Sequence, residues 1–330
     1  MMQQSKIKWG IMGTGWIAQQ FASDLALVSN GEALAVGSRT AGSAAEFASK
    51  YDIPRSYGSY EELVRDPDID VVYIATPHPL HHENVRLCLD AGKAVLCEKP
   101  FTINSRELED LVAAARERKL FLMEAMWTRF LPPIVKVREW LKEGRIGEVR
   151  LLKADFGFRS GWNPEGRLLN LQLGGGALLD AGIYPVSFAS MIFGAEPDQI
   201  WSTAHIGETG VDEQFSVILS YDSGKTASLN GAIRLGMTNE AHIFGTNGHI
   251  HIPSFLNAKS ATLHVDGEDT VHFNDDRKEI GYAFEAYEVG RCLAEGQLES
   301  DVIPLNESVA IMKLLDQIRG QWGLKYPSEG

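Results

Sequence analysis

The sequence predicts an α/β protein with an N-terminal Rossmann domain, built on a doubly wound parallel sheet, and a C-terminal α+β domain with a large, mainly antiparallel open sheet. An apolar run over 7–12 leads through Gly-x-Gly-x-x-Ala straight into helical sequence. Apolar strands then alternate with helical segments up to about residue 125, which indicates a parallel sheet covered on both faces. Beyond that point the runs alternate with a period of two between turn signals, as in antiparallel sheets.

The glycine motif predicts a dinucleotide site. Gly13 permits a tight turn, Gly15 lets the backbone approach a pyrophosphate, and Ala18 lets the helix over 16–29 pack on the strand. The first N–H groups of that helix are unpaired and favour an anion. The alternative is a purely structural turn. The residues expected to contact the cofactor here are Gly13, Thr14, Gly15, Trp16 and Ile17.

The end of the next strand, 33–37, bears on the choice of cofactor. An Asp or Glu at this position would bind the ribose hydroxyl of NAD, but the sequence continues with Ser38 and Arg39. A guanidinium can pair with a 2′-phosphate in two parallel hydrogen bonds. NADP is therefore predicted over NAD. The alternative is that Arg39 is an ordinary solvated cation.

Two further strands, 71–75 and 94–97, should bring polar residues to the same sheet edge, because the carboxyl ends of parallel strands line the cofactor crevice. The residues concerned are Thr76, Pro77, His78, Glu98 and Lys99. Helices are expected to begin at two capping-box patterns, 43–46 and 59–62, and to cover 81–91 and 104–118, with another strand at 120–124.

The second half of the chain, residues 126–330, is predicted to form the substrate-binding and dimerisation domain, in close contact with the dinucleotide-binding domain over 1–125. Its final helices should return toward the first domain. Apolar strands on an open sheet favour a homodimer or higher homo-oligomer formed through that sheet. The expected elements are helices at 132–142, 281–295 and 306–320, and strands at 149–158, 200–206, 214–221, 225–234, 240–244, 248–252 and 261–265.

Composition narrows the class of protein. The 330 residues are 44% hydrophobic and 23% charged, values ordinary for a globular chain, and the net charge of −13 disfavours nucleic acid and anionic membranes as partners. The N-terminal residues show no cleavage signature, and no apolar run is long enough to predict a membrane span. Three cysteines without paired spacing favour buried thiols in a reducing, cytoplasmic location.

Motifs spread along the chain resemble the glucose–fructose oxidoreductase/inositol dehydrogenase (Gfo/Idh/MocA) superfamily. The run 91–100, ending in Glu-Lys-Pro, is most similar to its dimeric dihydrodiol dehydrogenase branch, also described as NADP-dependent D-xylose dehydrogenases. The similarity covers nearly the whole chain. One departure is that no second arginine closely follows Arg39. The matching motifs are 13–18, 98–100, 124–130, 174–184, 208–212 and 302–305.

The resemblance implies oxidation of a sugar or polyol hydroxyl, with Lys99 and Tyr184 beside the nicotinamide and a cis peptide between Lys99 and Pro100. An unperturbed tyrosine loses its proton only near pH 10, and a neighbouring cation favours the phenolate. Our hypothesis is that Tyr184 exchanges the proton, Lys99 polarises the oxygen, and Asp180 orients Lys99 or the sugar. Asp180 as a helix cap and Tyr184 as a packing residue remain alternatives, and Pro185 predicts a helix break at Tyr184.

Aromatic and histidine residues allow further interpretations. Trp127, Arg129, Phe156 and Trp162 are candidates for the substrate pocket, with core packing as the alternative. The loop from Phe156 to Leu173 has no confident match in the family. We expect no metal site, because His78, His81 and His82 lack accompanying ligands and His249 and His251 lie on a sheet surface as structural residues.

Three functions remain compatible with these patterns. The favoured one is an NADP-dependent dehydrogenase acting on a sugar or cyclic trans-diol. The second is an NADPH-dependent reductase of an oxo-sugar of the anhydrofructose type, and the third is a nucleotide-binding regulator without catalysis. The presence of both Lys99 and Tyr184 argues against the regulator.

Overall fold

A computed structural model describes residues 6–329. The N-terminal stretch used above to argue against a cleaved signal thus lies mostly outside the described residues. The chain forms two compact units. The first comprises residues up to 102 together with 106–127 and 279–308, and the second comprises 103–105, 128–278 and the residues from 309 onward.

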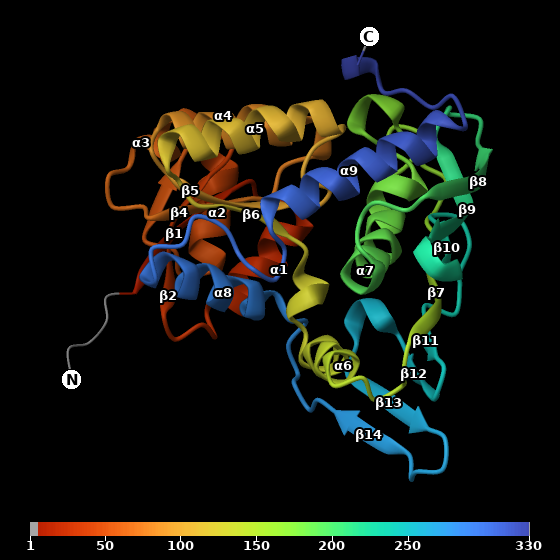
Figure 1. The fold of residues 1–330 in the computed structure, drawn as a ribbon. Coiled ribbons are helices and arrows are strands. Elements are labelled where there is room, and N and C mark those ends of the chain that lie inside the picture. Colours follow the sequence, from red (N-terminus) through yellow and green to blue (C-terminus); the bar gives the residue numbers. More distant parts are fainter. Residues whose placement is uncertain (1–5, 330) are drawn as a thin grey trace, which may run out of the picture. The chain divides into compact units, whose positions relative to one another are not determined.

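The first unit contains a six-stranded parallel sheet in the order β3-β2-β1-β4-β5-β6, which confirms the predicted Rossmann architecture. β4 and β5 are buried along their whole length, as expected for strands covered on both faces. Figure 1 shows α4 and α5 along one face of this sheet and α1 and α8 along the other. The strands are β1 (Ile7–Met12), β2 (Gly31–Gly37), β3 (Arg55–Tyr57), β4 (Val71–Ile74), β5 (Ala94–Glu98) and β6 (Leu122–Ala125).

The helices of this unit follow the predicted order, with two local differences. α1 ends at Leu25 rather than near residue 29. α2 begins one turn earlier than predicted, because Thr40 rather than Ser43 is the cap and its side chain accepts a hydrogen bond from the Ser43 N–H. The edge strand β3 was not predicted, because three residues give no usable periodicity. The helices are α1 (Trp16–Leu25), α2 (Ala41–Lys50), α3 (Tyr60–Arg65), α4 (His81–Asp90), α5 (Ser105–Arg118) and α8 (Tyr282–Ala294).

The second unit contains an eight-stranded sheet in the order β14-β13-β12-β11-β7-β10-β9-β8. It is mainly antiparallel, as predicted, but β7 and β10 pair in parallel. The strands are β7 (Val149–Gly157), β8 (Gln199–Ile206), β9 (Asp212–Tyr221), β10 (Lys225–Ala232), β11 (Ala241–Gly245), β12 (Gly248–Ile252), β13 (Ser260–Val265) and the unpredicted β14 (Val271–Asn274).

One face of this second sheet is covered by helices. α7 (Ile183–Phe193) packs on β7 and β10, α6 (Pro132–Lys142) packs on β13 and β14, and α9 (Leu305–Gly320) runs from the first unit into the second. The other face, which we call the outer face, exposes alternate residues of β9, as the period-two pattern predicted. Trp201 and Ile218, which are paired across β8 and β9, are 52% and 48% exposed there.

The sequence analysis expected no membrane span, but the helical run Leu171–Phe193 is long and apolar enough to cross a membrane, with a mean hydropathy of 1.4. However, 83% of the most apolar 18-residue stretch of this run is buried inside the protein, which is typical of a core helix. The predicted break at Tyr184 is wrong. A π-helical turn, Leu178–Gly182, continues directly into α7, whose first turn accommodates Pro185.

Candidate functional site

The predicted cofactor residues of the first unit lie at or just after the carboxyl ends of β1, β2, β4 and β5. Trp16 and Ile17 form the start of α1, and His78 begins a short 3₁₀ helix. The strand order reverses direction between β1 and β4. In open α/β sheets this switch point is where ligands bind.

The glycine turn after β1 is shaped for a phosphate group. Gly13 has φ +104°, and a Cβ there would lie 2.9 Å from the carbonyl oxygen of Ala75. A Cβ on Gly15 would meet open space, so a ligand can approach the backbone. Gly15 also precedes α1 without any side-chain cap, and the first turn of α1 holds no acidic residue. The helix N–H groups and dipole are therefore available to an anion, and the turn fits a pyrophosphate.

The end of β2 presents a cation rather than an acid. Ser38 is buried, with its hydroxyl 3.5 Å from that of Thr14, and Arg39 is exposed. Arg39 lies close enough to Tyr60 to act on its phenol electrostatically, although burial dominates and raises the pKa of Tyr60. The end of β2 therefore carries a cation at the position where an acid would bind a free ribose hydroxyl.

The ends of β4 and β5 are held together by His81. Its Nε2 lies 2.8 Å from the carbonyl oxygen of Thr76, and its Nδ1 lies 2.9 Å from that of Pro100. The Thr76 hydroxyl accepts a hydrogen bond from Asn84 at 3.0 Å. Burial lowers the pKa of His81. The sequence considered His81 only as a metal ligand, whereas in the structure it fixes two turns of the candidate cofactor site.

Lys99 lies at the carboxyl end of β5 beside a buried acidic cluster, and its peptide bond to Pro100 is cis, as the resemblance implied. Glu98 accepts hydrogen bonds from the Tyr73 hydroxyl at 2.5 Å and from the Lys99 N–H at 3.2 Å. Glu285 of α8 is fully buried, and burial together with the nearby charge of Glu98 raises its pKa well above the usual range. Sequence reasoning had no signal for Glu285.

In the second unit, the π-helical turn and α7 carry the other predicted catalytic residues. Asp180 is 6% exposed and forms an ion pair with Arg167 at 2.7 Å. Tyr184 is 7% exposed and meets the ring of Phe156 edge-on, with centroids 5.6 Å apart. The structure thus brings Tyr184 together with Phe156, a predicted pocket residue. It also gives Asp180 an unpredicted partner, Arg167, which lies in the loop that had no confident family match.

Asp212, at the start of β9, supports the same helical turn. Its Oδ2 accepts a hydrogen bond from the Leu178 N–H at 2.6 Å. Gly176 has φ +125°, and a side chain there would collide with the Asp212 carboxylate. Burial raises the pKa of Asp212 to about 7. This group positions the turn that bears Asp180, a role that the sequence did not reveal.

The remaining pocket candidates lie in different environments. Trp127, in the first unit, is 2% exposed and packs on Tyr282 with ring centroids 4.9 Å apart. Arg129, in the second unit, donates hydrogen bonds to the hydroxyl and carbonyl oxygens of Ser187. Trp162 is 50% exposed, beneath the guanidinium of Arg234. Their assignment to a substrate pocket stays a prediction.

The fold and the glycine turn together define a nicotinamide-nucleotide-binding oxidoreductase. Residues 7–126 match the model of an oxidoreductase family with an NAD-binding Rossmann fold, and residues 134–251 match the Gfo/Idh/MocA C-terminal domain. The chain belongs to the Gfo/Idh/MocA oxidoreductase family, and it is a dehydrogenase-type enzyme. It is 41% identical to a trans-1,2-dihydrobenzene-1,2-diol dehydrogenase of Mus musculus and 40% identical to that of Homo sapiens, each over 98% of this chain and 99% of the relative.

Solved structures give the same fold. The 3-ketoreductase KijD10 of Actinomadura kijaniata, in complex with NADP and TDP-benzene, is 27% identical, with a TM-score of 0.84 over 96% of this chain and 98% of that one. That ketoreductase has also been solved with one lysine replaced by alanine and with one tyrosine replaced by phenylalanine. The aldose-aldose oxidoreductase of Caulobacter crescentus, at 24% identity and a TM-score of 0.88, shares the fold.

Proposed function

We propose that this protein is an NADP-dependent dehydrogenase that oxidises one hydroxyl of a cyclic trans-diol or a sugar. The observation that carries the proposal is similarity over nearly the full chain to dehydrogenases named for a trans-diol. The glycine turn and Lys99, both at the crevice edge of the parallel sheet, support it.

The preference for NADP rests on the end of β2. Arg39 stands where an NAD enzyme would carry an acid, and a guanidinium binds a phosphate through charge-assisted hydrogen bonds. Ser38 and Thr14 supply hydroxyls beside it. A structural neighbour binds NADP, which is consistent with this preference.

The chemistry needs a hydride acceptor and a proton acceptor, because oxidation of a carbinol removes a hydride from carbon and a proton from oxygen. Bound NADP⁺ would supply the hydride acceptor. We propose that the Tyr184 phenolate takes the hydroxyl proton, while the Lys99 ammonium stabilises the developing alkoxide. The buried acidic cluster at Glu98 fixes the backbone of Lys99.

Each domain then has a distinct task in this proposal. Residues 1–125 bind the dinucleotide, and residues 126–330 bind the substrate, so the reaction requires Lys99 and Tyr184 to converge. Asp180, held by Arg167, orients the substrate or Lys99. The side chains proposed to line the pocket are Trp127, Arg129, Phe156 and Trp162.

The outer face of the second sheet supports a proposal about assembly. Trp201 and Ile218 form an exposed apolar pair across neighbouring strands, and such a surface favours a homodimer. The three cysteines are free and buried, which fits a reducing, cytoplasmic location. Fractionation of the source cells tests the location, and sedimentation tests the assembly.

Absorbance of the reduced nicotinamide tests the function, with trans-diols, pentoses and hexoses assayed with NADP and with NAD, and oxo-sugars assayed with NADPH. We expect turnover with NADP and a trans-diol or sugar. Turnover only of oxo-sugars with NADPH would establish the reductase instead, which runs the same residues in the opposite direction. Nucleotide binding without turnover of any substrate would contradict catalysis.

A further inference from the structure

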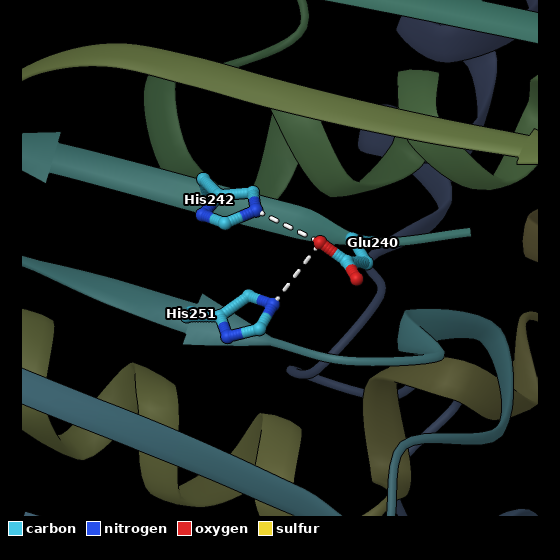
Figure 2. Close-up of side chains that lie close together, drawn as sticks. All are labelled: Glu240, His242 and His251. Carbon is cyan, nitrogen blue, oxygen red and sulfur yellow. Dashed lines mark hydrogen bonds and ion pairs between the residues drawn. The ribbon is translucent and has the colours of Figure 1, made fainter. Parts of the chain in front are cut away.

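A cluster of two histidines and a glutamate lies on the outer face of the second sheet. Glu240 immediately precedes β11, His242 lies in β11, and His251 lies in β12. His242 and His251 are directly opposite each other in the antiparallel pairing of these strands. Glu240 and His242 are two residues apart and therefore share a face. Figure 2 shows both rings directed at the Glu240 carboxylate.

The donor atoms have separations close to those around a metal ion. Glu240 Oε2 lies 3.1 Å from His242 Nε2 and 3.2 Å from His251 Nε2, and one donor atom from each residue lies within 4.8 Å of the others. Ligand atoms at about 2.0–2.1 Å from a tetrahedral ion are about 3.3 Å apart. The imidazole rings are nearly parallel, at 13° and 4.3 Å between centroids. Each ring must turn slightly to direct its lone pair at one ion, and side chains that are about one-third exposed permit this.

The surroundings leave charge and space for an ion. Glu240 and His242 line a hollow of about 200 Å³ with Asp155 and Lys153. The carboxylate of Asp155 adds negative charge, which the Lys153 ammonium partly offsets. Water molecules in this hollow would complete the coordination.

We propose that Glu240, His242 and His251 form a binding site for a divalent transition-metal ion, with Zn²⁺ the best match. Two imidazole nitrogens and one carboxylate oxygen are a ligand set that suits this ion. The site lies on the face of the sheet opposite α7, which carries Tyr184, so it is separate from the proposed catalytic residues of this unit. Strands β7 and β10 separate it from the exposed apolar pair of Trp201 in β8 and Ile218 in β9.

Titration of chelator-treated protein with Co²⁺ and Zn²⁺ tests the proposal, with the visible absorption of bound Co²⁺ and its displacement by Zn²⁺ as readouts. We expect one saturable ion per chain. His251→Ala and Glu240→Gln should each raise the dissociation constant by about tenfold or more. Zn²⁺ should also raise the melting temperature of the wild-type protein, and raise it less for His251→Ala.

The matched control is His264→Ala. His264 stacks on His249 of the neighbouring strand in a similar way, at 4.4 Å and 17°, but this pair is outside the three-residue cluster. Its replacement should leave the affinity unchanged. Equal weakening by His264→Ala and His251→Ala would show diffuse binding to surface histidines and overturn the site. Failure of the folded wild-type protein to bind Co²⁺ or Zn²⁺ at millimolar concentration would overturn it as well.

Discussion

The two sheets of this protein use their surfaces differently. The parallel sheet of the first unit is covered on both faces, as the full burial of β4 and β5 shows, and in such sheets ligands bind at the carboxyl ends of the strands. The sheet of the second unit has helices on one face and leaves alternate residues of β9 exposed on the other. Ligand binding is therefore expected at an edge of the sheet in the first unit, whereas the second unit exposes a whole sheet face.

Lys99→Ala tests the edge of the parallel sheet most severely. We expect kcat to fall by about 100- to 1000-fold, because a preorganised cation at the developing alkoxide is lost, while NADP binding persists in a fluorescence titration. Lys93→Met is the matched control. Lys93 immediately precedes the same strand, but it donates to the carbonyl oxygens of Asp66 and Ile69, so its loss should lower stability and spare kcat. An unchanged kcat in Lys99→Ala would remove Lys99 from the mechanism.

Tyr184→Phe tests whether the helix-covered face of the second sheet contributes to the reaction. The phenylalanine ring keeps the contact with Phe156 but cannot exchange a proton, so kcat should fall by about 100-fold or more. The melting temperature should stay close to that of the wild-type protein. A variant that turns over normally would identify Tyr184 as a packing residue.

Arg39→Ala tests the cofactor preference at the sheet edge, because it should weaken the binding of NADP much more than that of NAD. The dissociation constant for NADP should rise by about 10- to 100-fold, since a charge-assisted pair is lost. That for NAD should change by less than about twofold. Arg65→Ala, at the end of α3, controls for the general loss of positive charge. Equal weakening of both nucleotides would refute the NADP assignment.

Trp201→Glu tests the use of the outer face for assembly. A charge in the apolar pair with Ile218 should shift the proposed dimer toward monomer by at least about tenfold in its dissociation constant, as measured by sedimentation. Leu27→Glu is the control, because Leu27 is 57% exposed in the first unit. Monomeric wild-type protein, or an equal shift in the control, would contradict the proposed interface.

Asp212→Asn tests the support of the π-helical turn through the pH dependence of stability. The pKa of this carboxyl is about 7 in the folded chain, against an ordinary value of 3.8. The folded state therefore holds more protons between these values, and the unfolding free energy should fall as pH rises, by up to about 1.4 kcal/mol per pH unit. Asparagine cannot titrate, so urea unfolding at pH 5 and pH 7 should show a shallower decline for the variant. Parallel slopes would disprove the shift.

Much of the fold was predictable, because local patterns carry it. The glycine turn, the buried strands and the change of periodicity near residue 126 each depend on a few consecutive residues. The missed features lacked such a pattern. β3 and β14 are short edge strands, and Thr40 rather than Ser43 caps α2. The break predicted at Pro185 is wrong because a π-helical turn leads into α7 and leaves the proline in its first turn.

For the candidate sites, the sequence predicted which residues lie at strand ends, but it did not predict which side chains they contact. Glu98 and Lys99 were predicted as site residues. Glu285, whose pKa is raised in part by the charge of Glu98, was not predicted, because it lies in a helix almost 190 residues later. Asp180 was predicted without Arg167. His251 is predicted from the sequence to be a structural residue on a sheet surface. The structure places it beside His242 of the neighbouring strand β11 and Glu240, which precedes that strand. The alternation of apolar and polar residues along one strand predicts which face of the sheet a side chain occupies. It does not predict which other strand lies beside that strand.

The sequence by itself thus determined the strand, turn and helix at each ligand-facing edge, because backbone preferences and apolar periodicity act over neighbouring residues. Only the tertiary structure decided that β7 pairs with β10 in parallel, that Asp212 supports the turn at Leu178, and that two histidines meet one glutamate. These contacts join residues far apart in the chain. They depend on the register between neighbouring strands, which is set by the packing of whole elements against one another.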